Sequence, residues 1–404
     1  MINVNLIRKD FPILDQRVNG QKLIYFDNAA TSQTPNQVVQ SIVDYYKQTN
    51  SNIHRGTHKL SIQATTAYEE TRGKVQKYFN TKLPQEIIFT SGTTQSINII
   101  TLGYTDLLTS EDEVIVSEME HHSNIVPIQM LCERTGARLN VIPMDEQGNL
   151  IISEFDKVLS EKTKLVFISH VSNALGTVNP ISEIIKKSHC MGAKVLVDGA
   201  QGASHFEIDL QKLDVDYYTV SAHKMYGPTG VGVLYGKEEL LEKLSPWHGG
   251  GEMIDEVSFE KTTYGKLPHK FEPGTPNIAG VIAFGSAIEY INNIGLKNIK
   301  AYEDELLEYS TVELKKIEGL KIYGEAKNKT SVISFNVEGI HHYDLGSLLD
   351  QFGVAVRIGH HCAQPVMNYF KIPGTVRMSF SFYNTKEEIN IMIQALKQAI
   401  KMLQ

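Results

Sequence analysis

The stretch Lys194-Val-Leu-Val-Asp198-Gly-Ala-Gln201 is an apolar run that ends in an acid and continues into small residues. Such a run predicts a buried strand, and the small residues after it let a ligand approach the backbone closely. A second apolar run leads into Ser221-Ala-His223-Lys224. Because ligands of parallel α/β sheets bind at the carboxyl ends of the strands, we expect Asp198 and Lys224 at one edge of a sheet.

Short apolar runs alternate with helix-like segments on both sides of this stretch. We expect strands at 86–90, 113–117, 138–143, 164–170, 194–198, 217–221 and 231–235. Helices are expected at 35–48, 62–79, 94–105, 124–136 and 182–192, with Thr34 as the cap of the first. This alternation predicts a mainly parallel sheet covered by helices, in the α/β class.

The pattern changes after about residue 290. A long amphipathic helix is expected at 296–317, followed by strands at 332–337 and 354–357 and a final helix from Lys386. These elements predict a second, smaller α+β domain. We expect a large domain over 23–291 and a small domain made of 1–22 and 292–404.

Composition narrows the class of function. The chain has 404 residues, 42% of them hydrophobic and 21% charged, with a net charge of -7. An acidic chain without a long basic run disfavours nucleic-acid binding, and no run reaches the roughly 18 apolar residues of a membrane span. The charged start and the three cysteines, which match neither a disulfide framework nor a C-x-x-C metal motif, predict a cytoplasmic protein with reduced thiols.

Lys224 and Asp198 together suggest pyridoxal phosphate chemistry. That cofactor needs a lysine amine for a Schiff base and a carboxylate that keeps its pyridine nitrogen protonated. Each residue also has an ordinary interpretation, since most lysines are solvated surface charges and an aspartate at a strand end often caps a turn. The pairing of the two favours the cofactor.

A phosphate site is expected at Phe89-Thr90-Ser91-Gly92-Thr93-Thr94-Gln95, where a strand passes into a helix. Backbone N–H groups and the helix dipole favour an anion there, although hydroxyl residues before a helix are more often simple caps. In the next segment, Glu120-His121-His122, His121 could stack on a cofactor ring and relay protons. Paired histidines also invite a zinc site, but no further ligand cluster supports one, so we expect no metal.

The remaining candidate is Arg357-Ile-Gly-His360-His361-Cys362-Ala, just after an expected strand of the small domain. An arginine and two histidines near a thiol lower its pKa and enrich the thiolate. A free cysteine is more often a buried apolar residue, which is how we interpret Cys132 and Cys190. The polar neighbours set Cys362 apart.

These motifs, in this order, resemble a fold-type I pyridoxal phosphate enzyme, and more closely the SufS class of cysteine desulfurases. The resemblance covers nearly the whole chain, and the short R-x-G-H-H-C-A form at Cys362 marks that class. It implies a large, mainly parallel seven-stranded sheet domain with a smaller α+β domain. It also implies homodimers with active sites at the interface.

The resemblance further implies a role for each matched position. Lys224 would hold the cofactor, Asp198 would pair with its pyridine nitrogen, His121 would stack on the ring and Gln201 would bond the ring oxygen. The phosphate would be held by Thr93, Thr94, Ser221 and His223, and by Thr275 of a second subunit. The substrate carboxylate would be bound by Arg377 and Asn173, helped by Ala30 and His54, with Arg357 near the thiol.

The implied reaction converts L-cysteine to L-alanine and leaves a persulfide on Cys362 for an acceptor in iron-sulfur cluster assembly. Tyr343 stands where the branch that uses a SufU acceptor has a histidine, which favours a SufE-type acceptor and a SufBCD-like scaffold. Two alternatives stay open: a selenocysteine lyase or cysteine sulfinate desulfinase, and a sulfur-relay scaffold without turnover.

Overall fold

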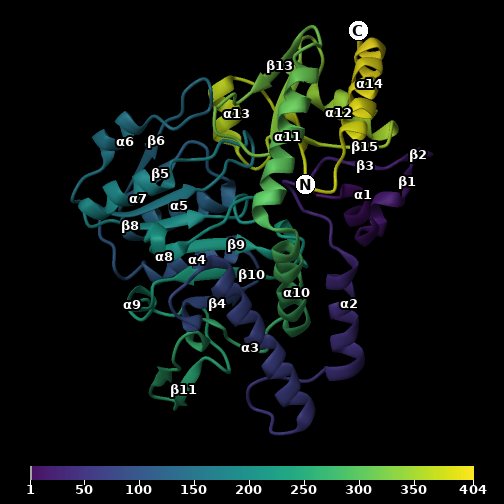
Figure 1. Cartoon of the computed structure of the whole chain (residues 1–404). Helices are drawn as coiled ribbons and strands as arrows, with labels where there is room; N and C mark the ends of the chain where they lie inside the picture. Colours follow the sequence, from purple (N-terminus) through teal and green to yellow (C-terminus); the bar gives the residue numbers. More distant parts are fainter. Residues whose placement is uncertain (1) are drawn as a thin grey trace.

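A computed structural model describes residues 2–404, and a seven-stranded sheet lies at its centre (Figure 1). The strand order is β4-β10-β9-β8-β7-β5-β6. Only β10 runs in the direction opposite to the other six strands. The bounds are β4 Ile87–Thr90, β5 Glu113–Ser117, β6 Arg138–Ile142, β7 Thr163–Ser169, β8 Lys194–Asp198, β9 Tyr217–Ser221 and β10 Gly232–Gly236. Every strand expected here is present, within one residue at each end, and the mainly parallel α/β sheet is confirmed.

Helices cover both faces of this sheet. Successive side chains of β7 point to opposite faces of the sheet, and each face is covered by an apolar core. Leu165 and Phe167 lie in the first core, and Val166 and Ile168 lie in the second. The first core is closed by α4 (Thr93–Gly103) and α5 (Val126–Thr135). The second is closed by α3 (Lys59–Phe79), α7 (Ile181–Cys190) and α10 (Ile278–Ile294).

Two of the predicted helices are corrected here, and one further helix was missed. The first helix, α2, spans Asn36–Asp44, and Thr34 is not its cap, because Pro35 occupies the N-cap position and the Thr34 hydroxyl donates to Gly227 O. The helix expected from residue 124 begins at Val126, since His122–Asn124 forms a separate 3-10 turn. Helix α10 was not predicted. It is buried nearly all round, so its sequence shows no polar face.

The small domain contains a four-stranded sheet in the order β13-β14-β17-β16. Its elements are α11 Leu296–Leu314, β13 Leu320–Tyr323, β14 Val332–Val337, α12 His342–Gln351, β16 Arg357–Gly359, α13 Gln364–Phe370, β17 Thr375–Ser379 and α14 Lys386–Leu403. The strand expected at 354–357 is divided. β15 (Val354–Ala355) pairs with β3 (Ile24–Tyr25), and only β16 joins the four-stranded sheet, because the chain changes partner at Val356.

The N-terminal segment bridges the two parts of the molecule and lies beside the C-terminal helix (Figure 1). Phe11 and Leu14 pack in the main core, whereas Ile24 and Phe26 pack in the core of the small domain. The shorter elements are α1 Val4–Ile7, β1 Arg17–Val18, β2 Gln21–Lys22, α6 Ile152–Val158, α8 Leu210–Leu213, α9 Glu238–Leu241, β11 Ile254–Val257 and β12 Thr262–Tyr264. Within residues 2–404, no helix combines the length and the apolarity needed to cross a membrane.

Candidate active site

A cavity of about 220 Å³ lies where the carboxyl ends of the central strands face the small domain. Most of the predicted site residues line it: Ala30, Thr93, Thr94, His121, Asn173, Asp198, Gln201, Ser221, His223, Lys224, Arg357, Cys362 and Arg377. The large domain contributes most of these side chains, and the last part of the chain contributes Arg357, Cys362 and Arg377. The fold thus brings together residues that are far apart in the sequence.

Lys224 and Asp198 occupy adjoining strand ends. Asp198 ends β8 and accepts a hydrogen bond from the Ala200 N–H at 2.9 Å. Lys224 lies in the 3-10 turn directly after β9. Burial lowers the pKa of Lys224, while the charge of Asp198 acts in the opposite direction. Burial also raises the pKa of Asp198, and the lysine opposes that shift. An amine biased toward its neutral form is a better nucleophile for an aldehyde.

His121 is held as a neutral ring. Its Nδ1 accepts a hydrogen bond from the Ser123 backbone N–H at 3.0 Å, which leaves the proton on Nε2. Burial and then the charge of Lys224 lower the pKa of His121 to about 3. A flat uncharged ring at the cavity wall suits stacking on an aromatic cofactor.

The strand-to-helix turn before α4 forms a polar cradle. Thr93 N donates to Ser221 Oγ at 2.9 Å, and Ser221 Oγ donates to Thr93 Oγ1 at 2.9 Å. Gly92 has φ 151°, and a Cβ there would lie 3.3 Å from Ser221 Oγ, so the turn requires glycine. Threonine and serine hydroxyls at the start of an eleven-residue helix are suited to a phosphate.

The amide groups near the cavity have defined partners. Gln201 Nε2 donates to Ala29 O at 2.7 Å, and its second N–H is available for a ligand oxygen. Asn173 Nδ2 donates to His361 O at 2.6 Å and so ties the cysteine-bearing loop to the large domain. His223 bonds Thr31 Oγ1 through Nδ1 at 3.2 Å, and burial lowers its pKa to about 4.

Arg377 is buried beneath the cavity. Its NH1 donates to Asn173 O and its NH2 to Asp27 Oδ1, each at 2.9 Å. Its Nε has no hydrogen-bond partner among residues 2–404. A buried N–H without a partner is costly, so this group is suited to receive an anionic ligand. Asp27 was not predicted as a site residue, because its contact with Arg377 depends on pairing across the fold.

The loop that carries Cys362 has an unusual backbone. His361 and Cys362 have φ values of 52° and 55°, in the left-handed region that residues with a side chain seldom adopt. His361 is buried, and its Nε2 bonds Thr375 Oγ1 at 2.7 Å, whereas His360 is exposed. Burial and nearby arginines hold the pKa of His361 well below its usual range. His361 therefore packs as a neutral ring, and His360 is the histidine open to solvent.

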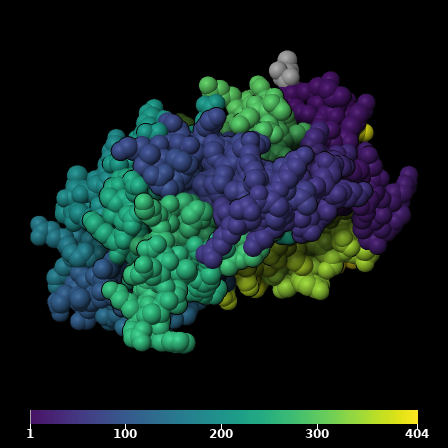
Figure 2. All heavy atoms as spheres, turned by 90° about the horizontal axis from the view of Figure 1, so that it is seen from below, coloured from purple at the N-terminus to yellow at the C-terminus, as the bar shows by residue number. Residues whose placement is uncertain are grey.

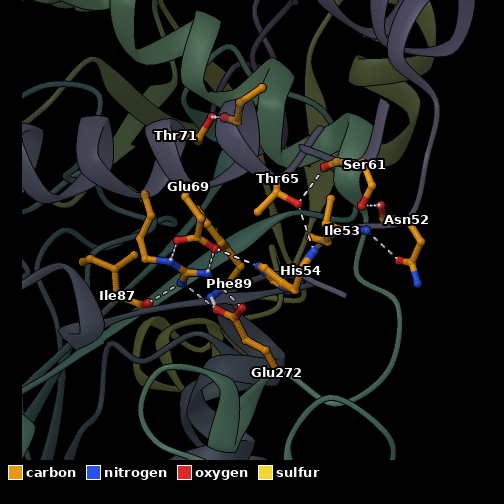
Figure 3. Close-up of polar contacts among 12 residues, drawn as sticks. Asn52, Ile53, His54, Ser61, Thr65, Glu69, Thr71, Ile87, Phe89 and Glu272 are labelled. Atoms are coloured by element: carbon orange, nitrogen blue, oxygen red, sulfur yellow. Dashed lines mark hydrogen bonds and ion pairs between the residues drawn. The ribbon is translucent and has the colours of Figure 1, made fainter. Parts of the chain in front are cut away.

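His54 and Thr275 lie outside the cavity lining within the described chain. His54 Nε2 bonds Glu69 Oε1 at 3.0 Å, and Arg72 links the partly buried Glu69 to the buried Glu272 (Figure 3). Thr275 is exposed. His54 is thus held by Glu69, and neither residue contributes to the cavity within the described chain.

Several lining residues were not predicted: Ala29, Ser123, Ser169, Val171, Ala200 and His361. The sequence offered a signal for four of them, since Ser123 follows His121 by two residues, Ala200 follows Asp198 by two, and Ala29 and His361 adjoin Ala30 and Cys362. Ser169 and Val171 enter the lining through tertiary packing. Taken together, a buried lysine, a buried carboxylate, a hydroxyl cradle and a flat histidine ring match the aldehyde, pyridine nitrogen, phosphate and ring of pyridoxal phosphate.

Comparisons with known proteins give the family of this chain. The model of the aminotransferase class-V family matches residues 24–392. A probable cysteine desulfurase of Synechocystis is 48% identical over 399 residues, covering 98% of this chain and 95% of that protein. The structure of the cysteine desulfurase CsdA of Escherichia coli superposes with a TM-score of 0.93 at 36% identity, covering 100% of both chains. The apo cysteine desulfurase of Thermococcus onnurineus gives 0.95 at 39%, covering 100% of this chain and 99% of that one. The chain therefore belongs to the aminotransferase class-V family.

Proposed function

We propose that the protein is a pyridoxal phosphate-dependent cysteine desulfurase of the SufS class. It converts L-cysteine to L-alanine and retains the sulfur as a persulfide on Cys362. One observation carries the proposal: a cysteine from the small domain lines the same cavity as Lys224 and Asp198. A lysine and aspartate pair alone would fit many enzymes of the family, whereas the added thiol fits sulfur transfer.

Bound pyridoxal phosphate supplies an electron sink for bonds at the substrate Cα. Lys224 and Asp198 would hold it through its aldehyde and pyridine nitrogen, and its phosphate would be held by Thr93, Thr94, Ser221 and His223. Lys224 Nζ then takes the Cα proton of the substrate, which its burial-lowered pKa favours. Gln201 and His121 bind the ring oxygen and the ring face.

Arg377 and Asn173 bind the substrate carboxylate, helped by Ala30. The free Nε of Arg377 supports this assignment, because a carboxylate oxygen would give the buried N–H an acceptor. Arg357 is half-buried, lies 3.9 Å from Asp27 and lines the same cavity as Cys362. We assign it to the surroundings of the thiol.

Sulfur moves in a balanced exchange. The Cys362 thiolate forms an S–S bond with the substrate sulfur as the substrate C–S bond breaks. The electron pair of the broken bond stays with carbon and, after protonation, ends in the methyl group of alanine. The S–S bond keeps the transferred sulfur on the protein until the thiol of an acceptor attacks it.

A homodimer is part of the proposal. Apolar side chains are exposed on two helical segments. Val39 of α2 is 48% exposed and Tyr46, just after α2, is 61% exposed. Leu60 and Ile62 of α3 are 43% and 54% exposed. Figure 2 shows α2 and α3 across one face, with the green segment that contains β11 and β12 beside them. Such an apolar surface fits a subunit interface, across which His54 and Thr275 would reach a second active site.

The acceptor is proposed to be of the SufE type, serving a SufBCD-like scaffold, rather than of the SufU type. Tyr343 supports this choice, because it is 61% exposed at the start of α12 and is therefore available to a docking partner. Turnover should rise with purified SufE-type protein, and stimulation by SufU-type protein alone would contradict the choice. We place the enzyme in the cytoplasm, because a persulfide-forming thiol needs a reducing compartment.

A single turnover tests the proposed function. Holoenzyme is mixed with substoichiometric L-cysteine, alanine is quantified, and the Cys362 peptide is weighed under non-reducing conditions. We expect one alanine per added L-cysteine and one added sulfur atom on that peptide. The control Cys190→Ser removes an exposed thiol elsewhere and should give the same result. Alanine without added sulfur would instead indicate a lyase, and no alanine would indicate a relay scaffold.

A further inference from the structure

Cys362 lies in a cluster with two histidines that come from different parts of the chain. One ring nitrogen from His122, one from His360 and Sγ of Cys362 all lie within 4.8 Å of one another. His122 follows β5 of the central sheet, whereas His360 and Cys362 follow β16 of the small domain. The two motifs were each visible in the sequence, but their meeting was not predicted, because His122 and His360 are far apart along the chain.

Hydrogen bonds hold both rings against the cysteine loop. The His122 N–H donates to Cys362 O at 2.7 Å, and Gln364 N donates to His122 Nε2 at 3.1 Å. Cys362 N donates to His360 Nδ1 at 3.1 Å. Both accepting nitrogens carry a lone pair and no proton, as a metal ligand requires. The two ring centroids lie 5.5 Å apart with 36° between the planes.

We propose that His122, His360 and Cys362 form a site for Zn²⁺ that reversibly blocks the nucleophile. Two imidazoles and a thiolate suit zinc, whereas Mg²⁺ and Ca²⁺ require oxygen ligands. Three protein ligands leave one coordination position open to a water molecule. The ligand atoms must contract to tetrahedral spacing, which exposed His360 and half-exposed His122 allow by side-chain rotation.

Binding is a ligand exchange without redox chemistry. A Zn–S bond and two Zn–N bonds form, and the thiol proton passes to the buffer. The backbone N–H groups of Cys362 and Gln364 lose their histidine acceptors, but both of these bonds lie at exposed positions where water replaces them. The sulfur lone pair needed for attack is then engaged by the metal. Zinc also joins the two domains, since its ligands come from both.

The decisive measurement is zinc binding to the holoenzyme, with a structural readout. X-ray absorption at the zinc edge should show one sulfur near 2.3 Å and two histidine nitrogens near 2.0–2.1 Å. Titration calorimetry should give one zinc per chain and a heat that depends on the buffer, because a proton is released. Zinc should raise the thermal midpoint and inhibit alanine formation, with both effects reversed by EDTA and absent with Mg²⁺.

Variants identify the ligands. Cys362→Ser should abolish tight zinc binding, and His122→Ala and His360→Ala should each weaken it by about tenfold or more. The controls Cys190→Ser and His341→Ala remove an exposed thiol and an exposed imidazole elsewhere, and they should leave zinc affinity unchanged. Unchanged affinity in both histidine variants, or loss of binding in Cys190→Ser, would overturn the site.

The inhibitory effect rests on the proposed function, whereas the metal site does not. Zinc bound by one sulfur and two nitrogens in a protein that releases no alanine would sustain the site and contradict the desulfurase. A working desulfurase whose zinc affinity is independent of His122 and His360 would contradict the site and leave the proposed function intact.

Discussion

Arg377 donates to Asp27 at 2.9 Å, yet its Nε points to no acceptor within residues 2–404. Burial raises the pKa of Asp27, and the Arg377 charge and hydrogen bond oppose that shift. The aspartate and Asn173 O therefore hold the guanidinium in one orientation. In the proposed function, this orientation is set before a substrate carboxylate binds.

Replacing Arg377 by lysine should weaken substrate binding. Arg377→Lys keeps the charge but loses the planar fork that bonds Asp27 and a carboxylate together. We expect KM for L-cysteine to rise by about tenfold or more, with a smaller change in kcat. Steady-state kinetics provide the measurement, and Arg134→Lys, at an exposed position, is the control. An unchanged KM would remove Arg377 from the substrate site.

Lys224→Ala should lose the visible absorption of the lysine-bound cofactor and all desulfurase activity. In the proposed site this amine anchors the aldehyde of the cofactor, and the spectrum reports that bond directly. Lys297→Ala, whose side chain is 84% exposed, should keep both properties. Survival of the absorption band in Lys224→Ala would show that another residue anchors the cofactor.

Cys362→Ala should separate the possible substrates. Sulfur transfer requires the thiol, so persulfide formation and alanine release from L-cysteine should be lost while the cofactor spectrum stays. Selenocysteine and cysteine sulfinate release their leaving atoms more readily, so alanine should still form from them. Comparing alanine release from the three substrates checks this. Persulfide formation in the variant would show that Cys362 is only structural.

Arg72 should be important for stability. Its side chain is 2% exposed, and its NH1 and NH2 donate to Glu272 at 2.8 and 3.0 Å. Arg72→Met leaves the Glu272 carboxylate buried without its cation, which costs about 3–5 kcal/mol. We expect a clearly lower denaturation midpoint, partly restored by adding Glu272→Gln. The surface control Arg134→Met should change stability by less than about 0.5 kcal/mol.

His170 should make the fold less stable in acid. Burial lowers its pKa to about 4, so it is neutral in the folded protein at pH 5, whereas the unfolded chain takes up a proton below about pH 6.5. Stability therefore falls as the pH decreases from about 6.5 to about 4.

His170→Gln should reduce the loss of stability between pH 7 and pH 5 by up to about 2 kcal/mol. Denaturation midpoints at the two pH values give the comparison, and His341→Gln, at an exposed position, is the control. An identical pH dependence in His170→Gln and the unaltered protein would contradict this assignment.

The seven central strands and the placement of Lys224 and Asp198 at their carboxyl edge followed from sequence alone. Each strand is a short apolar run, and a polar residue that directly follows such a run lies at the carboxyl edge of the sheet. The cysteine loop was recognisable for a similar reason, because Arg357, His360, His361 and Cys362 are close neighbours in the chain.

Tertiary structure alone decided the contacts between distant segments. Asp27 meets Arg377, and His122 meets Cys362, because separate parts of the chain pack together, and no local periodicity encodes such pairs. Helix α10 was not predicted, because other segments bury it on nearly every side and its sequence therefore shows no polar face. Local patterns determined the elements and the reactive residues, whereas long-range packing determined which side chains hold those residues in place.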